Sequence, residues 1–148
     1  MQGVGFLLLA GGQSRRMGGG DKNQLNLGGK SVLHHILDRV DRAGAPTAIN
    51  ANGDPLRFAA YGLPVIADVI DGYAGPLAGI LTGLEWISMY HPKCTHMISL
   101  ATDAPFLPPD LAHRLYARLG RDAIIVQAQS NGQRHPVFAI WPVALAAD

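Results

Sequence analysis

The chain has 148 residues, a formal net charge of +1, 48% hydrophobic residues and only 16% charged ones. This length allows one domain with a real core, and the low charged fraction argues against a disordered chain. The near-zero net charge provides no overall basic field to attract nucleic acid. We therefore expect a single globular domain over residues 1–148 with no nucleic-acid partner.

Cysteine content and hydropathy indicate the compartment. Cys94 is the only cysteine, so no disulfide can form within the chain, and a reducing compartment is favoured. The apolar N-terminus lacks a basic flank and breaks at Gly11, which predicts a core strand rather than a signal peptide. No apolar run approaches the roughly 20 residues of a membrane span. The expected location is the cytoplasm, with no membrane contact.

The first predicted element is a buried strand over residues 4–10, followed by a glycine-rich loop. The apolar run ends abruptly at Gly11 and Gly12, as is typical of a strand buried on both faces. Glycines expose backbone N–H groups that suit an anion, and basic side chains add full charges. The basic residues of the loop are Arg15, Arg16 and Lys22. The sequence therefore predicts a phosphate site, most simply for a nucleotide.

Two standard phosphate motifs do not match this loop. The adjacent glycines do not have the spacing of the dinucleotide fingerprint. The triplet Gly29-Lys30-Ser31 resembles the end of a P-loop, but the first glycine of that motif would fall on Gln24. Lys30 is therefore predicted to be a surface residue of a turn.

Helical and extended segments alternate along the remainder of the chain. The predicted helices cover residues 31–42, 54–61, 77–90 and 109–119, and the predicted strands cover residues 47–52, 64–68, 95–101, 123–128 and 136–141. Such alternation with short connections predicts an α/β fold, a three-layer α/β/α domain with a mostly parallel sheet.

The helix over residues 77–90 has two distinct patterns. Five apolar residues are predicted to line one face: Leu77, Ile80, Leu81, Leu84 and Ile87. Glycines recur at every fourth position, at Gly75, Gly79 and Gly83. These glycines predict close packing of the helix on the sheet.

Polar residues stand at the ends of successive predicted strands. Asn50 and Asn52 end one strand, Asp68 ends the next, and Asp103 follows the strand over residues 95–101. Each has an ordinary explanation as a fraying end, a cap or a turn residue. In an open α/β sheet, however, ligands gather outside the carboxyl ends of strands, so one site explains them together. Asp103, facing a phosphate loop, is where Mg²⁺ would be held.

The loop residues, read together, resemble the signature of the molybdenum cofactor guanylyltransferases within the Rossmann-like nucleotidyltransferases. The signature is Leu9-Ala10-Gly11-Gly12-x-Ser14-x-Arg16-Met17-Gly18 with Asp21-Lys22. Further matching blocks are Asn50-Ala51-Asn52, Val65-Ile66-Ala67-Asp68, Gly75-Pro76-Leu77-Ala78-Gly79, Asp103-x-Pro105-Phe106-Leu107-Pro108 and His135-Pro136-Val137-Phe138. The loop is shared with cytidylyl and sugar-phosphate nucleotidyltransferases, whereas the combination of blocks is more specific. The resemblance implies a nucleotide-diphospho-sugar transferase type of Rossmann-like fold.

The resemblance also implies roles for individual residues. Four loop residues would lie against the guanine nucleotide: Leu9, Ala10, Gly11 and Gly12. Lys22 and Arg16 would bind its phosphates, and Asp103 would hold magnesium. Asn50 and Asp68 would bind the nucleoside part.

The implied reaction is Mg²⁺-dependent transfer of GMP from GTP to molybdopterin, with release of pyrophosphate. Proteins that deliver the cofactor or mature molybdoenzymes are the expected protein partners. Two alternatives stay open: a nucleotidyltransferase for CTP or a sugar phosphate, and a non-catalytic nucleotide-binding remnant. The sequence stops before the family's C-terminal Asn-rich motif, so we expect a domain that lacks its C-terminal part.

Overall fold

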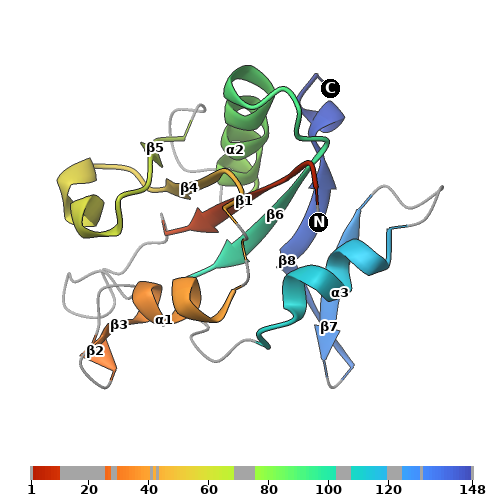
Figure 1. Cartoon of the computed structure of the whole chain (residues 1–148), viewed down its shortest axis with the longest axis horizontal. Helices are drawn as coiled ribbons and strands as arrows, with labels where there is room; N and C mark the ends of the chain where they lie inside the picture. The colour runs from red at the N-terminus through yellow and green to blue at the C-terminus, as the bar shows by residue number, and fades with distance from the viewer. Residues whose placement is uncertain are drawn as a thin grey trace.

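The computed structural model describes residues 2–10, 26–27, 30–40, 42, 44–68, 76–102, 108–119, 125–130 and 132–147 (Figure 1). Its strands are β1 (Val4–Leu9), β2 (Asn26–Leu27), β3 (Lys30–Ser31), β4 (Thr47–Asn50), β5 (Val65–Ile66), β6 (His96–Ala101), β7 (Val126–Ser130) and β8 (Gln133–Pro142). Its α-helices are α1 (Val32–Arg39), α2 (Pro76–Tyr90) and α3 (Leu111–Ala117). Two 3-10 helices, η3 (Pro55–Tyr61) and η4 (Val143–Ala147), complete the described elements.

The main sheet has six strands in the order β5-β4-β1-β6-β8-β7. Strands β5, β4, β1 and β6 run parallel, and β8 runs antiparallel to both of its neighbours. At the centre, Phe6 of β1 stands opposite Thr47 on one side and Ile98 on the other. The prediction of a mostly parallel sheet is confirmed.

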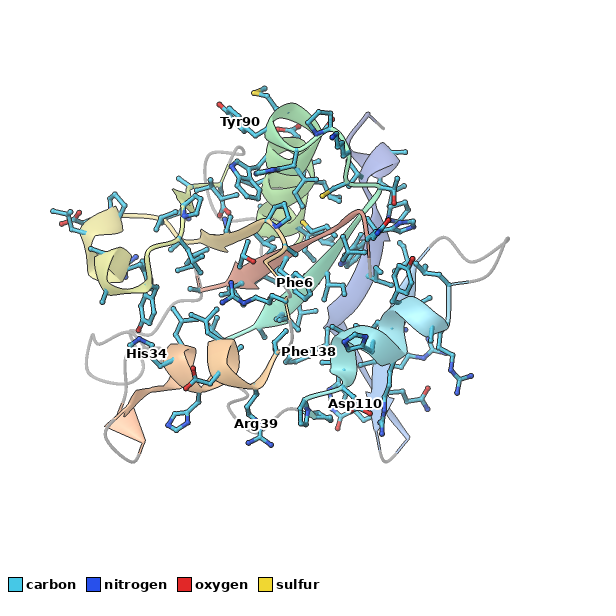
Figure 2. All side chains as sticks on the ribbon, viewed as in Figure 1. Phe6, His34, Arg39, Tyr90, Asp110 and Phe138 are labelled. Atoms are coloured by element: carbon cyan, nitrogen blue, oxygen red, sulfur yellow. The ribbon has the colours of Figure 1, made fainter. Side chains whose placement is uncertain are left out.

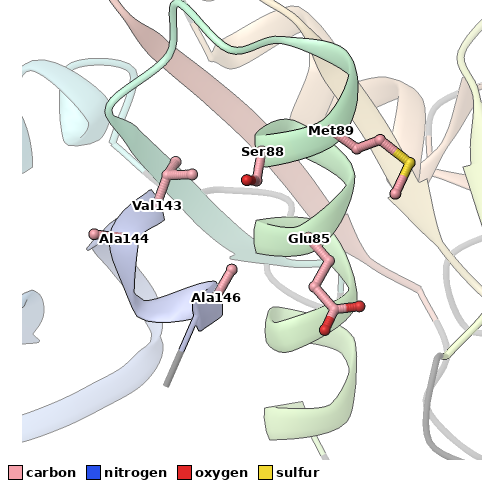
Figure 3. A pocket seen from close by; sticks show the side chains of 6 residues that line it. All are labelled: Glu85, Ser88, Met89, Val143, Ala144 and Ala146. Atoms are coloured by element: carbon pink, nitrogen blue, oxygen red, sulfur yellow. The ribbon is translucent and has the colours of Figure 1, made fainter.

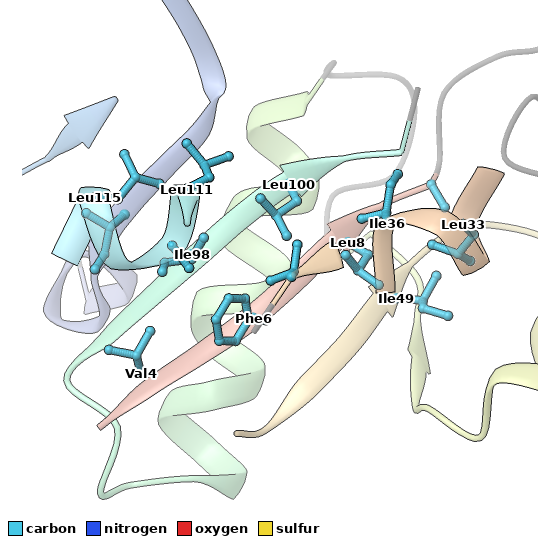
Figure 4. Packing of buried hydrophobic residues seen from close by; sticks show 14 of the residues in the cluster. Val4, Phe6, Leu8, Leu33, Ile36, Ile49, Ile98, Leu100, Leu111 and Leu115 are labelled. Carbon is cyan, nitrogen blue, oxygen red and sulfur yellow. The ribbon is translucent and has the colours of Figure 1, made fainter. Parts of the chain in front are cut away.

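Helices cover both faces of the sheet. Helices α1 and α3 lie on one face and α2 on the other (Figure 1). Because side chains alternate along a strand, Phe6 and Leu8 pack in the core under α1 and α3, whereas Leu7 packs in the core under α2. Figure 4 shows the first of these cores, in which Phe6 and Leu8 of β1 lie among side chains from β6, α1 and α3. The chain thus forms the predicted three layers.

Glycines determine how α2 lies on the sheet. A Cβ on Gly83 would come within 2.6 Å of Leu7 Cδ2 and 2.8 Å of Met97 Sδ, so the helix rests directly on β1 and β6 at this point. The buried face of α2 is centred near Gly79 and Gly83 and does not include Leu77, which is 66% exposed. The prediction that Leu77 lines the apolar face was therefore wrong. The buried side of this mostly apolar helix is the side on which Gly79 and Gly83 let the helix approach the sheet closely.

The element boundaries differ from the sequence expectations in several places. Lys30, predicted as a turn residue, lies in the short hairpin formed by β2 and β3. Helix α1 ends at Arg39, three residues before the predicted end, and β5 has only two residues. Strand β8 begins at Gln133 rather than Pro136, because it pairs with β7 through the Ser130–Gln133 rung of a tight hairpin.

Outside the sheet, Tyr90 at the end of α2 and Asp110 before α3 lie on the outer surface, whereas Phe6 lies inside (Figure 2). Helix η4 packs against α2 through Val143, Leu145 and Ala146. Among the helices in the described ranges, none has the length and apolar character that a membrane span requires.

Candidate nucleotide site

The carboxyl ends of four neighbouring parallel strands form one edge of the sheet. Strands β5, β4, β1 and β6 lie side by side and all point the same way. They lead into Asp68, Asn50, Ala10 and Thr102 respectively. This edge brings together residues that are far apart in the sequence, such as Leu9 and Thr102, which are 93 positions apart. It is the edge at which open α/β sheets bind ligands.

Asn50 and Asp68 are joined directly. The amide nitrogen Nδ2 of Asn50 donates to Asp68 Oδ1 at 2.9 Å and to the carbonyl of Ile66 at 3.2 Å. Asn50 is only 4% exposed, so these bonds satisfy both amide hydrogens in a buried position. The prediction that the two residues belong to one site is supported by their contact, while their binding to a nucleotide stays a prediction.

Asn52 holds Asp68 from the other side. Its Nδ2 donates to Asp68 Oδ2 at 3.0 Å, and its Oδ1 accepts the backbone N–H of Asp68 at 2.9 Å. Arg57 of η3 in turn donates from Nη2 to the carbonyl oxygen of Asn52 at 2.6 Å. Between them Gly53 has a φ of +91°, a conformation that side chains disfavour. We name Asn50, Asn52 and Asp68 the amide–carboxylate cluster.

The backbone at the end of β1 is partly occupied by protein contacts. The N–H of Ala10 donates to the carbonyl of Asn50 at 2.9 Å. The carbonyl of Leu9 accepts from the hydroxyl of Thr102 at 3.0 Å. These two bonds therefore fix the backbone at Leu9 and Ala10, where β1 ends.

Helix α2 lies directly against this edge. A Cβ on Gly79 would collide with Asn50 Oδ1 and would come within 2.8 Å of Leu9 Cδ2. Only glycine therefore allows the helix to pack here without displacing Asn50. The predicted role of Gly79 in close packing is confirmed, and the structure shows that the packed group is a residue of the candidate site.

Several predicted site residues lie outside the described ranges: Gly11, Gly12, Arg16, Lys22 and Asp103. Among the described residues, no three His, Cys, Asp or Glu side chains gather to hold a metal ion. Sequence reasoning missed Arg57 and Thr102. Arg57 belongs to no motif, whereas a hydroxyl immediately before Asp103 was a signal that could have been noticed.

A separate groove of about 420 Å³ lies between α2 and η4, away from the sheet edge (Figure 3). Its lining includes Glu85, Met89 and Val143. The carboxylate of Glu85 would repel phosphate, and the lining residues include no basic side chain. This groove is a poor candidate for a nucleotide.

The chain matches the MobA-like NTP transferase domain over residues 6–148. The chain belongs to this family. It is 51% identical over 143 residues to a molybdenum cofactor guanylyltransferase of Bradyrhizobium sp. (strain ORS 278), covering 96% of this chain and 68% of the relative. It is 56% identical over 141 residues to the protein of that name from Mesorhizobium japonicum, covering 94% of this chain and 67% of the relative.

Solved structures support the same fold. The molybdopterin-guanine dinucleotide biosynthesis protein A of Archaeoglobus fulgidus has a TM-score of 0.70 at 19% identity, covering 97% of this chain and 69% of that one. The predicted resemblance and the predicted nucleotide-diphospho-sugar transferase type of fold are therefore confirmed. This member of the MobA-like family is an enzyme, a nucleotidyltransferase, and it spans about 68% of the length of the Bradyrhizobium relative.

Proposed function

We propose that this nucleotidyltransferase transfers GMP from GTP to molybdopterin in a Mg²⁺-dependent reaction. The observation that carries the proposal is the amide–carboxylate cluster at the carboxyl ends of β4 and β5, in a chain of the MobA-like family. The relatives named molybdenum cofactor guanylyltransferase support the choice of guanine and of molybdopterin. From the single cysteine, we propose that the enzyme works in the cytoplasm.

The order of the strands places Asp68 and Asp103 at opposite ends of the proposed site. Asp68 follows β5, and Asp103 comes directly after Thr102 at the end of β6. Three strand spacings separate β5 from β6, about 14 Å at roughly 4.8 Å each. This separation supports a nucleotide bound with its nucleoside near Asp68 and its phosphates near the loop and Asp103.

Asp103 is the residue that we propose for the metal. Asp68 is less suitable, because it follows β5, three strands away from β6 and from the end of the site to which we assign the phosphates. Oxygen ligands such as the Asp103 carboxylate suit Mg²⁺, which would offset the negative charge that develops on the phosphates.

In the proposed reaction, a phosphate oxygen of molybdopterin attacks the α-phosphorus of GTP. A new P–O bond forms, the bond between the α-phosphorus and the bridging oxygen breaks, and pyrophosphate leaves with the electron pair. Lys22, Arg16 and N–H groups of the loop, with Gly11 and Gly12, would stabilise the leaving group. The attacking phosphate is already anionic, so the chain does not need to supply a general base.

The test is a comparison of GTP, CTP, ATP and UTP with the purified chain, molybdopterin and Mg²⁺, with release of pyrophosphate as the readout. We expect turnover with GTP and little with the others. Preference for CTP would identify the cytidylyl alternative. A thermal shift with nucleotide but no pyrophosphate would identify a binding module instead.

The variant Asp103→Ala extends this test. We expect it to abolish transfer and to keep the thermal midpoint of the parent. Asp110→Ala is a matched control, because Asp110 is exposed and pairs with Arg114 at 2.8 Å on α3. Near-normal Mg²⁺-dependent turnover of Asp103→Ala would overturn the proposed metal ligand.

A further inference from the structure

The bonds around Asp68 show how its carboxylate is oriented. Oδ1 accepts from Asn50 and Oδ2 accepts from Asn52, so each oxygen has one donor among the described residues. A carboxylate offers about four lone-pair positions in all. The described residues therefore leave acceptor positions on Asp68 unused, and Asp68 is only partly buried.

The two asparagines differ in their burial and in the groups to which their amides bond. Asn50 is buried, and its amide hydrogens go to Asp68 and Ile66. Asn52 is exposed, and both ends of its amide contact a single residue, Asp68, through the carboxylate and the backbone N–H. Two bonds from one planar amide fix both the side chain and the backbone of Asp68.

Asn52 is itself held in place. The guanidinium of Arg57 donates from Nη2 to the Asn52 carbonyl at 2.6 Å and from Nε to the Asp54 carbonyl at 3.2 Å. Arg57 also lies over the ring of the buried Phe58, with its Cζ 4.9 Å from the ring centroid. The amide that orients Asp68 is thus attached to the core through η3.

We propose that Asn52 is a positioning residue that directs the Asp68 carboxylate toward a neighbouring pair of hydrogen-bond donors on the nucleoside part of the substrate. This inference rests on the proposed function and deepens it. A carboxylate can only accept, so it selects ligand groups that donate. A guanosine nucleotide has two such pairs: N1–H with the N2 amine on the base edge, and the two hydroxyls of the ribose.

The test compares the parent enzyme with Asn52→Ala, using GTP, inosine triphosphate and 2′-deoxy-GTP. Inosine triphosphate lacks the N2 amine, and 2′-deoxy-GTP lacks one hydroxyl of the ribose. We expect Asn52→Ala to raise the KM for GTP about tenfold, because a hydrogen bond to a charged group is lost, and to leave kcat within about twofold. We also expect it to reduce the preference of the parent for GTP over one of the two analogues by a similar factor.

The donor pair is identified by the analogue that Asn52→Ala, unlike the parent, no longer discriminates against relative to GTP. Loss of discrimination against inosine triphosphate identifies the base edge, and loss of discrimination against 2′-deoxy-GTP identifies the ribose. Asn52→Asp keeps the shape of the side chain and replaces the donor to Asp68 by a second carboxylate. Like charges repel, so we expect a larger increase in KM from this variant than from Asn52→Ala.

The matched control is Asp54→Ala in the same loop. Asp54 caps η3 by accepting the N–H of Leu56 at 2.9 Å, so its loss disturbs the loop without removing the amide of Asn52. The inference is overturned if Asn52→Ala and Asp54→Ala have equal effects, or if Asn52→Ala weakens all three nucleotides equally. Failure of the parent enzyme to prefer GTP over CTP, ATP and UTP would instead refute the proposed function, and the two failures are distinguishable.

Discussion

The hydroxyl of Thr102 donates to the carbonyl of Leu9 at 3.0 Å and thereby joins the ends of the two central strands, β1 and β6. The glycine-rich loop begins two residues after Leu9, and Asp103 comes immediately after Thr102. This bond therefore links the starting points of the two segments to which we assign phosphate and metal binding.

Thr102→Val removes this bond while keeping the shape of the side chain. Thr102 is buried, so the carbonyl of Leu9 would lose its partner away from water, which costs about 1–3 kcal/mol in free energy of unfolding. We expect kcat to fall as well, because the loop and Asp103 lose a shared anchor. Denaturant unfolding and steady-state turnover measure the two effects. Thr102→Ser keeps the hydroxyl and should resemble the parent; a Val variant as stable and active as the Ser variant would contradict this prediction.

Gly79→Ala and Gly83→Ala form a second, paired prediction. Both substitutions overpack the contact between α2 and the sheet, which costs about 1–3 kcal/mol, against a gain of up to about 1 kcal/mol in helix propensity. The Cβ at position 79 would meet Asn50, whereas the one at Gly83 would meet Leu7 and Met97. We therefore expect both variants to lose stability and only Gly79→Ala to weaken nucleotide binding.

Urea unfolding gives the two stability changes, and titration calorimetry with GTP gives the two dissociation constants. A Gly83→Ala variant that binds GTP as poorly as Gly79→Ala would mean that α2 acts on the site as a whole rather than through Asn50.

A third prediction concerns His96 and the dependence of the free energy of unfolding on pH. Burial lowers the pKa of His96 below its ordinary value. The unfolded chain, with a pKa of about 6.5 at this residue, then takes up the proton first as pH falls. Stability should therefore decline as pH falls below about 6.5 and level off below the lowered pKa of the folded state.

The measurement for His96 is the free energy of unfolding at several pH values between about 7 and about 5. His96→Gln lacks the titrating ring and should lose less stability over this interval. Parallel pH profiles for the parent and the variant would show that burial of His96 does not influence stability.

The sequence predicted most of the sheet because its strands are apolar runs that end in polar or glycine-rich segments. It also predicted that Asn50 and Asp68 lie close together, because the carboxyl ends of neighbouring parallel strands lie at the same edge of the sheet. It could not predict that Leu77 is exposed. Nearly the whole length of α2 is apolar, so periodicity alone does not identify its buried side, and the contacts of Gly79 and Gly83 decide it.

Other features depend on contacts that a local pattern does not encode. The bond between Arg57 and Asn52 depends on η3 folding back over the end of β4. The extra length of β8 depends on pairing with β7, since Gln133 and Arg134 are polar and exposed. The hairpin of β2 and β3 has two residues in each strand, too few for an alternating pattern.

The pairing of β1 with β6 has a consequence for the order of folding. Val4 stands opposite His96 and Leu9 opposite Ala101, so the central pair of the sheet joins segments about 92 residues apart. Such long-range pairing is slow to form, because the intervening chain loses entropy before the contacts stabilise it. On the ribosome, β1 can pair with β4 early, but the edge that carries Leu9 and Thr102 cannot close until β6 has emerged. The proposed site, which includes Asp103 after β6, therefore cannot be complete before most of the sheet has been synthesised.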